Sequence, residues 1–139
     1  MNKYSTLILT AAACLILSGC KTKSVEGKWN VVSDSEYKMS DYTITFQDGV
    51  MTTNANADGV KVLAEERYRY YGSTLDTPGA KVTIDASGLE GERRKQFESM
   101  STEFRFRFKT EKTFSVKMKD SNHMTLTEKK RVIELERAN

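Results

Sequence analysis

The stretch Tyr42-Thr43-Ile44-Thr45-Phe46-Gln47-Asp48-Gly49-Val50-Met51-Thr52-Thr53 decides the fold of this 139-residue chain. Tyr42, Ile44 and Phe46 alternate with polar residues, so they share one face of an extended strand. Asp48-Gly49 then supplies the two residues that adopt positive φ in a tight turn. The stretch therefore predicts an antiparallel hairpin with one apolar face.

Similar alternating runs follow one another along most of the chain. The clearest is residues 104–109, where three phenylalanines alternate with two arginines and a lysine, which predicts a strand with one buried and one cationic face. About eight or nine such strands, joined by tight turns without a helical crossover, predict an all-β antiparallel up-and-down meander. Closure into a small barrel of about eight strands would remove the sheet edges, and an open curved sheet or a two-sheet sandwich is the alternative.

Residues 89–100 interrupt this pattern. They contain several good helix formers, and Leu89, Phe97 and Met100 give a sparse apolar stripe. We expect a short helix or an ordered lid here, with a polar strand extension as the alternative.

Eight aromatic or aliphatic residues are in phase to face the interior of such a barrel. They either line a cavity for an apolar ligand or fill the core, since small barrels are often packed solid. These residues are Tyr42, Ile44, Phe46, Tyr68, Tyr70, Phe104, Phe106 and Phe108.

The first twenty residues have the features of an export signal. Lys3 precedes an apolar run over residues 7–17 that is too short to span a bilayer as a helix, as is typical of a secretory signal peptide. The run ends in Leu17-Ser18-Gly19-Cys20, which resembles the lipobox of bacterial lipoproteins. An ordinary signal peptide cut near Gly19, leaving Cys20 as a free thiol, is the alternative.

The lipoprotein resemblance implies three segments. Residues 1–19 would be a signal peptide removed between Gly19 and Cys20, residues 20–26 a lipidated tether, and residues 27–139 the folded domain. Cys20 would carry diacylglycerol and, on its amino group, a fatty acyl chain such as palmitate, which together anchor the protein to a membrane. Lys21 stands where proteobacterial lipoproteins retained at the inner membrane have Asp, so the resemblance implies the outer membrane, facing the periplasm.

A second resemblance lies at the start of the domain. Gly27-Lys28-Trp29 opens the first predicted strand and resembles the Gly-x-Trp signature of lipocalins and of small bacterial lipocalin-like domains. In that family the Trp packs across the closed bottom of the barrel and an Arg from the last strand covers its ring. The resemblance implies these structural roles for Gly27, Trp29 and Arg137, and a lipocalin-like barrel.

The sequence offers little for catalysis or for a metal. His123 is the only histidine, and with residues 1–19 removed and Cys20 lipidated no free thiol remains to join it in a metal site. No Gly-x-Ser-x-Gly nucleophile motif occurs. We therefore expect a non-catalytic protein without metal or cofactor.

Charge is distributed unevenly along the chain. Residues 20–91 carry 8 basic and 11 acidic side chains, whereas residues 92–139 carry 13 basic and 8 acidic ones. The excess of basic residues over residues 92–139 is either a solvated surface or a binding surface for an anionic partner in the envelope. Nucleic acid is not expected as a partner there.

Two function classes remain. The first is a binding module for a small hydrophobic ligand or lipid, and the second is a protein-interaction lipoprotein with a solid core, such as an accessory subunit, an inhibitor or an exclusion factor of an envelope assembly.

Overall fold

The computed structural model describes residues 24–139. The predictions for residues 1–23, namely the signal peptide, the cleavage site at Gly19 and lipidation at Cys20, lie outside the described residues. The elements in chain order are β1 (Gly27–Asp34), β2 (Ser40–Gln47), β3 (Val50–Ala57), β4 (Val60–Arg67), β5 (Arg69–Tyr71), β6 (Thr74–Thr77), β7 (Lys81–Asp85), α2 (Gly91–Lys109), β8 (Lys112–Met118), β9 (His123–Glu128) and β10 (Arg131–Arg137). No helix in this part of the chain is both long enough and apolar enough to cross a bilayer.

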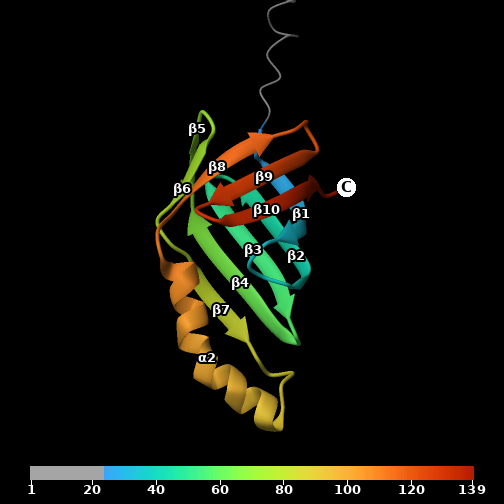
Figure 1. Cartoon of the computed structure of the whole chain (residues 1–139), viewed down its shortest axis with the longest axis vertical. Coiled ribbons are helices and arrows are strands. Elements are labelled where there is room, and N and C mark those ends of the chain that lie inside the picture. Colours follow the sequence, from blue (N-terminus) through green and yellow to red (C-terminus); the bar gives the residue numbers. More distant parts are fainter. Residues whose placement is uncertain (1–23) are drawn as a thin grey trace, which may run out of the picture.

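All strands belong to one antiparallel sheet that curls into a half-barrel (Figure 1). The hairpin predicted from residues 42–53 is confirmed: Gln47 pairs with Val50, and Asp48 and Gly49 have φ of 51° and 74°. The turn at Asp58-Gly59, between β3 and β4, also has positive φ at both residues, 51° and 91°. The prediction of an all-β antiparallel meander is therefore confirmed.

The ten strand segments trace eight long strands. β5 continues β4 after the single residue Tyr68, and β7 continues β6 after residues 78–80. Each of these pairs counts as one long strand. β6 pairs with β5 and β8, whereas β7 pairs with β4 alone. The chain thus leaves the barrel wall after β7, runs back as α2 beside β7, and rejoins the sheet as β8 (Figure 1).

Two apolar clusters fill the concave side. The larger contains Trp29, Ile44, Phe46 and Leu135 with neighbours from β3, β6, β8 and β9. The smaller lies between α2 and the sheet, and its members are Val60, Val62, Ala64, Ala80, Val82, Leu89 and Phe108. The interior is therefore packed at one end by strands alone and at the other by strands and a helix.

The strand predicted over residues 104–109 is wrong. These residues form the last turns of α2, which begins near the predicted helix over 89–100 but continues to Lys109. In a helix Phe104 and Phe108 lie four residues apart on one face, together with Phe97, while Phe106 points to the opposite side. Phe106 is accordingly 68% exposed. It does not face the interior, and the basic residues at 105, 107 and 109 do not form one cationic strand face.

Candidate ligand groove

The closed end of the half-barrel is built around Trp29, which is fully buried. Its indole Nε1 donates a hydrogen bond to the carbonyl oxygen of Val25 at 2.8 Å. The Arg137 guanidinium carbon lies 4.1 Å from the centroid of the Trp29 ring. The two residues are cross-strand neighbours on β1 and β10. The stacking that the lipocalin resemblance implied is therefore present.

Arg137 also closes this end through hydrogen bonds. Its guanidinium donates to the carbonyl oxygens of Ser121 at 2.8 Å, Glu26 at 2.7 Å and Ser24 at 3.0 Å. Gly27 leaves room for it: a Cβ at Gly27 would stand 2.8 Å from Arg137 Nη1, and the φ of Gly27 is +114°. The predicted residues Gly27, Trp29 and Arg137 are thus structural.

The predicted interior residues divide among several places. Tyr42, Ile44 and Phe46 are buried in the larger cluster, and Tyr68 and Tyr70 pack against it half-buried. Phe108 is buried in the smaller cluster, and Phe104 packs against it half-buried. The eight residues do not line one cavity, because seven of them are divided between two separate clusters and Phe106 is exposed to solvent.

A buried polar cluster, which sequence reasoning missed, lies at the opposite end of β1. Arg131 forms a two-point ion pair with Asp34, from Nη2 to Oδ2 at 2.6 Å and from Nε to Oδ1 at 3.1 Å. Tyr42 joins it through its hydroxyl, which lies 3.1 Å from both partners. The Tyr37 ring stacks beneath the Arg131 guanidinium, 4.7 Å from ring centroid to guanidinium carbon.

This cluster shifts the titration of its members. Burial works to raise the pKa of the Asp34 carboxyl, but hydrogen bonds from Arg131 and from the Glu36 amide, with the Arg131 charge, hold that pKa below its usual range. Burial raises the pKa of Tyr42 well above the ordinary tyrosine value. Asp34 is therefore a carboxylate at neutral pH, paired with a permanent cation.

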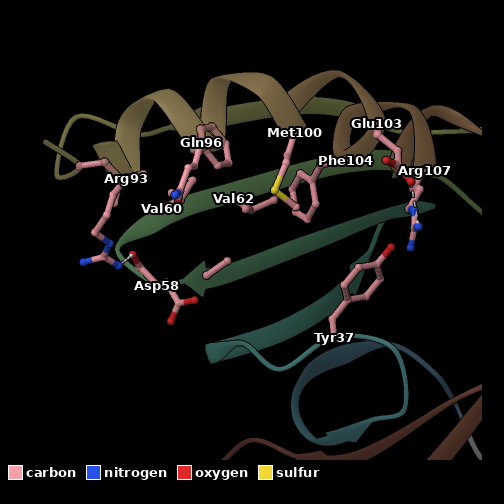
Figure 2. Close-up of a pocket in the computed structure, with 13 residues that line it drawn as sticks. Tyr37, Asp58, Val60, Val62, Arg93, Gln96, Met100, Glu103, Phe104 and Arg107 are labelled. Atoms are coloured by element: carbon pink, nitrogen blue, oxygen red, sulfur yellow. Dashed lines mark hydrogen bonds and ion pairs between the residues drawn. The ribbon is translucent and has the colours of Figure 1, made fainter. Parts of the chain in front are cut away.

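An open site with a mostly apolar lining lies between α2 and the sheet, with a volume of about 460 Å³ (Figure 2). Val60 and Val62 of β4 form its floor, and Met100 and Phe104 of α2 form its roof. Met100 is 67% exposed, so apolar surface remains accessible to solvent. We call this space the α2 groove. Its other lining residues are Tyr37, Ala57, Asp58, Leu89, Arg93, Gln96, Phe97, Glu103 and Arg107.

Polar groups lie at the two ends of the α2 groove. At one end Arg93 Nη2 donates to the main-chain oxygen of Asp58 at 3.0 Å. At the other end Arg107 Nη2 donates to Glu103 Oε1 at 3.1 Å, and the Tyr37 ring rises toward Arg107 (Figure 2). Each guanidinium carries five N–H donors, so both arginines have donors left for a polar ligand group. The groove is therefore apolar along its length and polar at its ends.

Tyr37 connects the α2 groove to the buried polar cluster. Its ring stacks on Phe108 at 6.3 Å between centroids with an interplanar angle of 22°, and it meets Phe104 edge-on at 6.3 Å. It comes from the loop between β1 and β2, which shows no alternating pattern, so no local sequence signal marked it.

A second buried acid, Glu66, lies near the end of β4. Here the pairing between β4 and β7 ends, and the pairing between β5 and β6 begins shortly after. Burial raises the pKa of the Glu66 carboxyl, and the Lys112 charge opposes that shift. Glu66 Oε2 and the Thr77 hydroxyl have no hydrogen-bond partner among residues 24–139. The same part of the chain holds no group of three or more His, Cys, Asp or Glu side chains arranged to bind a metal.

Two solved structures share this architecture. A lipocalin-like protein from Bacteroides uniformis superposes with a TM-score of 0.52 at 13% identity, covering 81% of this chain and 97% of that one. The fold is lipocalin-like. An uncharacterized protein from Bacteroides eggerthii matches with a TM-score of 0.53 at 15% identity, covering 83% of this chain and all of that one. No protein-family model and no curated protein matches the chain.

Proposed function

We propose that this protein is a non-catalytic binding module that holds a small amphipathic ligand or lipid in the α2 groove. The observation that carries the proposal is an accessible apolar groove of about 460 Å³ with arginines at both ends. Sites for small molecules typically enclose about 300–1,000 Å³, with mostly apolar walls and a few polar groups that fix orientation.

The proposed site lies outside the barrel interior, which the sequence left as either a ligand cavity or a filled core. The larger cluster of the barrel is made of buried side chains that pack against one another, which favours a filled core at this end. Along the α2 groove, an apolar chain would lie against Val60, Val62, Met100 and Phe104, and a polar group would meet Arg107 at the end near Tyr37.

The proposal includes a membrane anchor on Cys20 and an outer-membrane location facing the periplasm. Ser24, bonded to Arg137, lies at the closed end of the half-barrel, whereas the β3–β4 turn and the start of α2 lie at the opposite end (Figure 1). Ser24 follows Cys20 by four residue steps, which span at most about 14 Å. The α2 groove would therefore face away from the anchored end.

Titration with a fluorescent C16 fatty acid tests the proposal, using the chain with Cys20→Ser so that no lipid is attached. Met100→Asp places a charge against the apolar chain and should weaken binding about tenfold, or ~1.4 kcal/mol. Phe106→Asp is the matched control, because Phe106 is equally exposed on the opposite face of α2 and should leave the affinity unchanged. Absence of binding, or equal effects of the two variants, would contradict the proposal.

A protein-interaction role is the second candidate, and the exposure of Phe106 favours it. This ring stands in solvent between Arg105 and Lys109 on the outer face of α2, as an aromatic anchor among cations would in an interface with an acidic partner. Crosslinking in intact cells followed by purification would then recover a partner that Phe106→Asp loses and Met100→Asp keeps. If no partner that depends on Phe106 is recovered, only the ligand-binding role remains.

A further inference from the structure

The two ends of α2 are attached to the sheet very differently. At the C-terminal end, the carbonyl oxygen of Phe108 accepts hydrogen bonds from the Ala80 amide at 2.9 Å and from Lys112 Nζ at 3.2 Å. The Phe108 side chain is buried. The main chain of Lys109 lies so close to Gly79 that no Cβ fits between them. This end is fixed through the backbone.

The N-terminal end has few attachments. No residue of α2 before Phe108 is buried. Among the described residues, one hydrogen bond joins the first turns of α2 to the sheet, from exposed Arg93 to the main-chain oxygen of Asp58. Glu90 at the N-cap makes no side-chain capping bond. Leu89, just ahead of the helix, is buried beside Gly59, and Phe97 in the second turn of α2 packs half-buried against the smaller cluster.

α2 also has internal contacts that hold it together as a unit. Glu92 pairs with Lys95, Arg94 with Glu98, and Glu103 with Arg107, all at helical spacings of three or four residues. Such pairs stabilise a helix independently of the surface on which it rests. These pairs join residues within α2, so they do not depend on contact with the sheet.

We propose that α2 is a lid over the groove, hinged at Phe108–Thr110 and latched at its first turn by Leu89 and Arg93. Met100 at the mouth of the groove is exposed, but Val60 and Val62 on its floor are each 2% exposed. Lifting of the latched end uncovers these two residues and admits the apolar chain of the ligand beneath the helix. This inference rests on the proposed function, because it describes how the same groove is reached. Residues 86–90, between β7 and α2, supply the slack, since five residues extend up to about 17 Å.

Thiol accessibility tests the hinge without any ligand. The chain has only two cysteines, so Cys14→Ser and Cys20→Ser remove every native thiol. Val62→Cys then places a thiol under the lid, and Ile44→Cys places one in the larger cluster; the parent side chains are 2% and 3% exposed. Lifting of α2 should make the first thiol react with a water-soluble aromatic disulfide at least ~10-fold faster than the second, because local opening precedes global unfolding. Equal rates that track global unfolding would overturn the lid.

A second pair of variants tests the latch and does not alter the core. In the Val62→Cys chain, Arg93→Ala removes the bond to Asp58 and should raise the labelling rate about fivefold, as expected for one lost hydrogen bond. Arg94→Ala is the control, because its contact is with Glu98 inside the helix. A labelling rate unchanged by Arg93→Ala, or raised equally by both variants, would overturn the latch.

Stopped-flow binding of the fluorescent C16 fatty acid separates the lid from the function. Arg93→Ala should speed probe association in parallel with thiol labelling. A probe that binds at an association rate unaffected by Arg93→Ala would overturn gating and leave the binding function standing. A probe that does not bind at all would overturn the proposed function, while the labelling ratio would still decide whether α2 is hinged.

Discussion

Replacing Arg131 with Met should destabilise the protein more than any exposed ion-pair change in the described chain. The Asp34 side chain is fully shielded from solvent and the Arg131 side chain is 9% exposed. Arg131→Met leaves the carboxylate buried beside Tyr42 without its cation, and breaking a buried pair in this way costs about 3–5 kcal/mol. Because Asp34 lies near the end of β1, we expect about 3 kcal/mol, a large part of the ~5–15 kcal/mol that holds a typical domain together.

Urea unfolding followed by the fluorescence of Trp29, the single tryptophan, measures this change. Arg107→Met is the matched control: its pair with Glu103 is exposed on both sides, and its loss should cost under ~1 kcal/mol. The double variant Asp34→Leu/Arg131→Met should recover part of the loss, because it removes the unpaired charge along with its partner.

The sign of the pH dependence follows from Asp34. Its pKa is lowered in the folded state, so its stabilising contribution is complete above the unfolded-state pKa of about 4 and is lost as the pH falls through the folded-state pKa. The difference between the native chain and Arg131→Met should be full at pH 7 and shrink below about pH 4. A loss under ~1 kcal/mol at pH 7, or a double variant less stable than Arg131→Met, would refute the reasoning.

Three further outcomes are expected. Burial raises the folded-state pKa of Glu66, so the native chain loses stability as the pH rises through that pKa. In urea unfolding, Glu66→Gln should therefore change the free energy of unfolding little near pH 4 and raise it by ~1 kcal/mol at pH 8. Gly79→Ala meets the main chain of Lys109 at positive φ and should cost ~1–3 kcal/mol more than Gly49→Ala, which has positive φ but open space around it; equal urea midpoints would count against the close contact. Cys20→Ser should leave the far-ultraviolet circular dichroism unchanged and move the protein to the soluble fraction after a high-salt wash; retention in the membrane fraction would contradict the lipid anchor.

Short-range sequence patterns were sufficient to predict the strands wherever the residues fitted a strand periodicity and no helical one. The hairpin over residues 42–53 formed in the predicted register because a two-residue turn with positive φ leaves only one pairing. Trp29 and Arg137 were expected to meet because, in the lipocalins that the Gly-x-Trp signature resembles, an Arg of the last strand covers the Trp of the first. They do lie opposite each other on β1 and β10.

Residues 104–109 show where local pattern fails. Six residues with phenylalanine at every second position fit a strand, but Phe104 and Phe108 also fit one face of a helix. The longer segment decided between them, because the pairs Arg94–Glu98 and Glu103–Arg107 and the apolar contacts of Phe97 are satisfied only at helical spacing. Most of those contacts involve residues outside 104–109, so the alternation within these six residues, taken alone, favours a strand.

The sequence by itself determined the antiparallel meander, because alternation and tight turns between successive strands are local features. Its Gly-x-Trp signature, through the resemblance to lipocalins, also indicated the contact between Trp29 and Arg137. The α2 groove and the Asp34–Arg131 pair required the tertiary structure. Asp34 and Arg131 are 97 residues apart, and Tyr37 comes from an irregular loop. Such contacts form only when strand ends that are far apart in the sequence meet and α2 packs against the sheet. The periodicity of a short stretch of sequence carries no information about that arrangement.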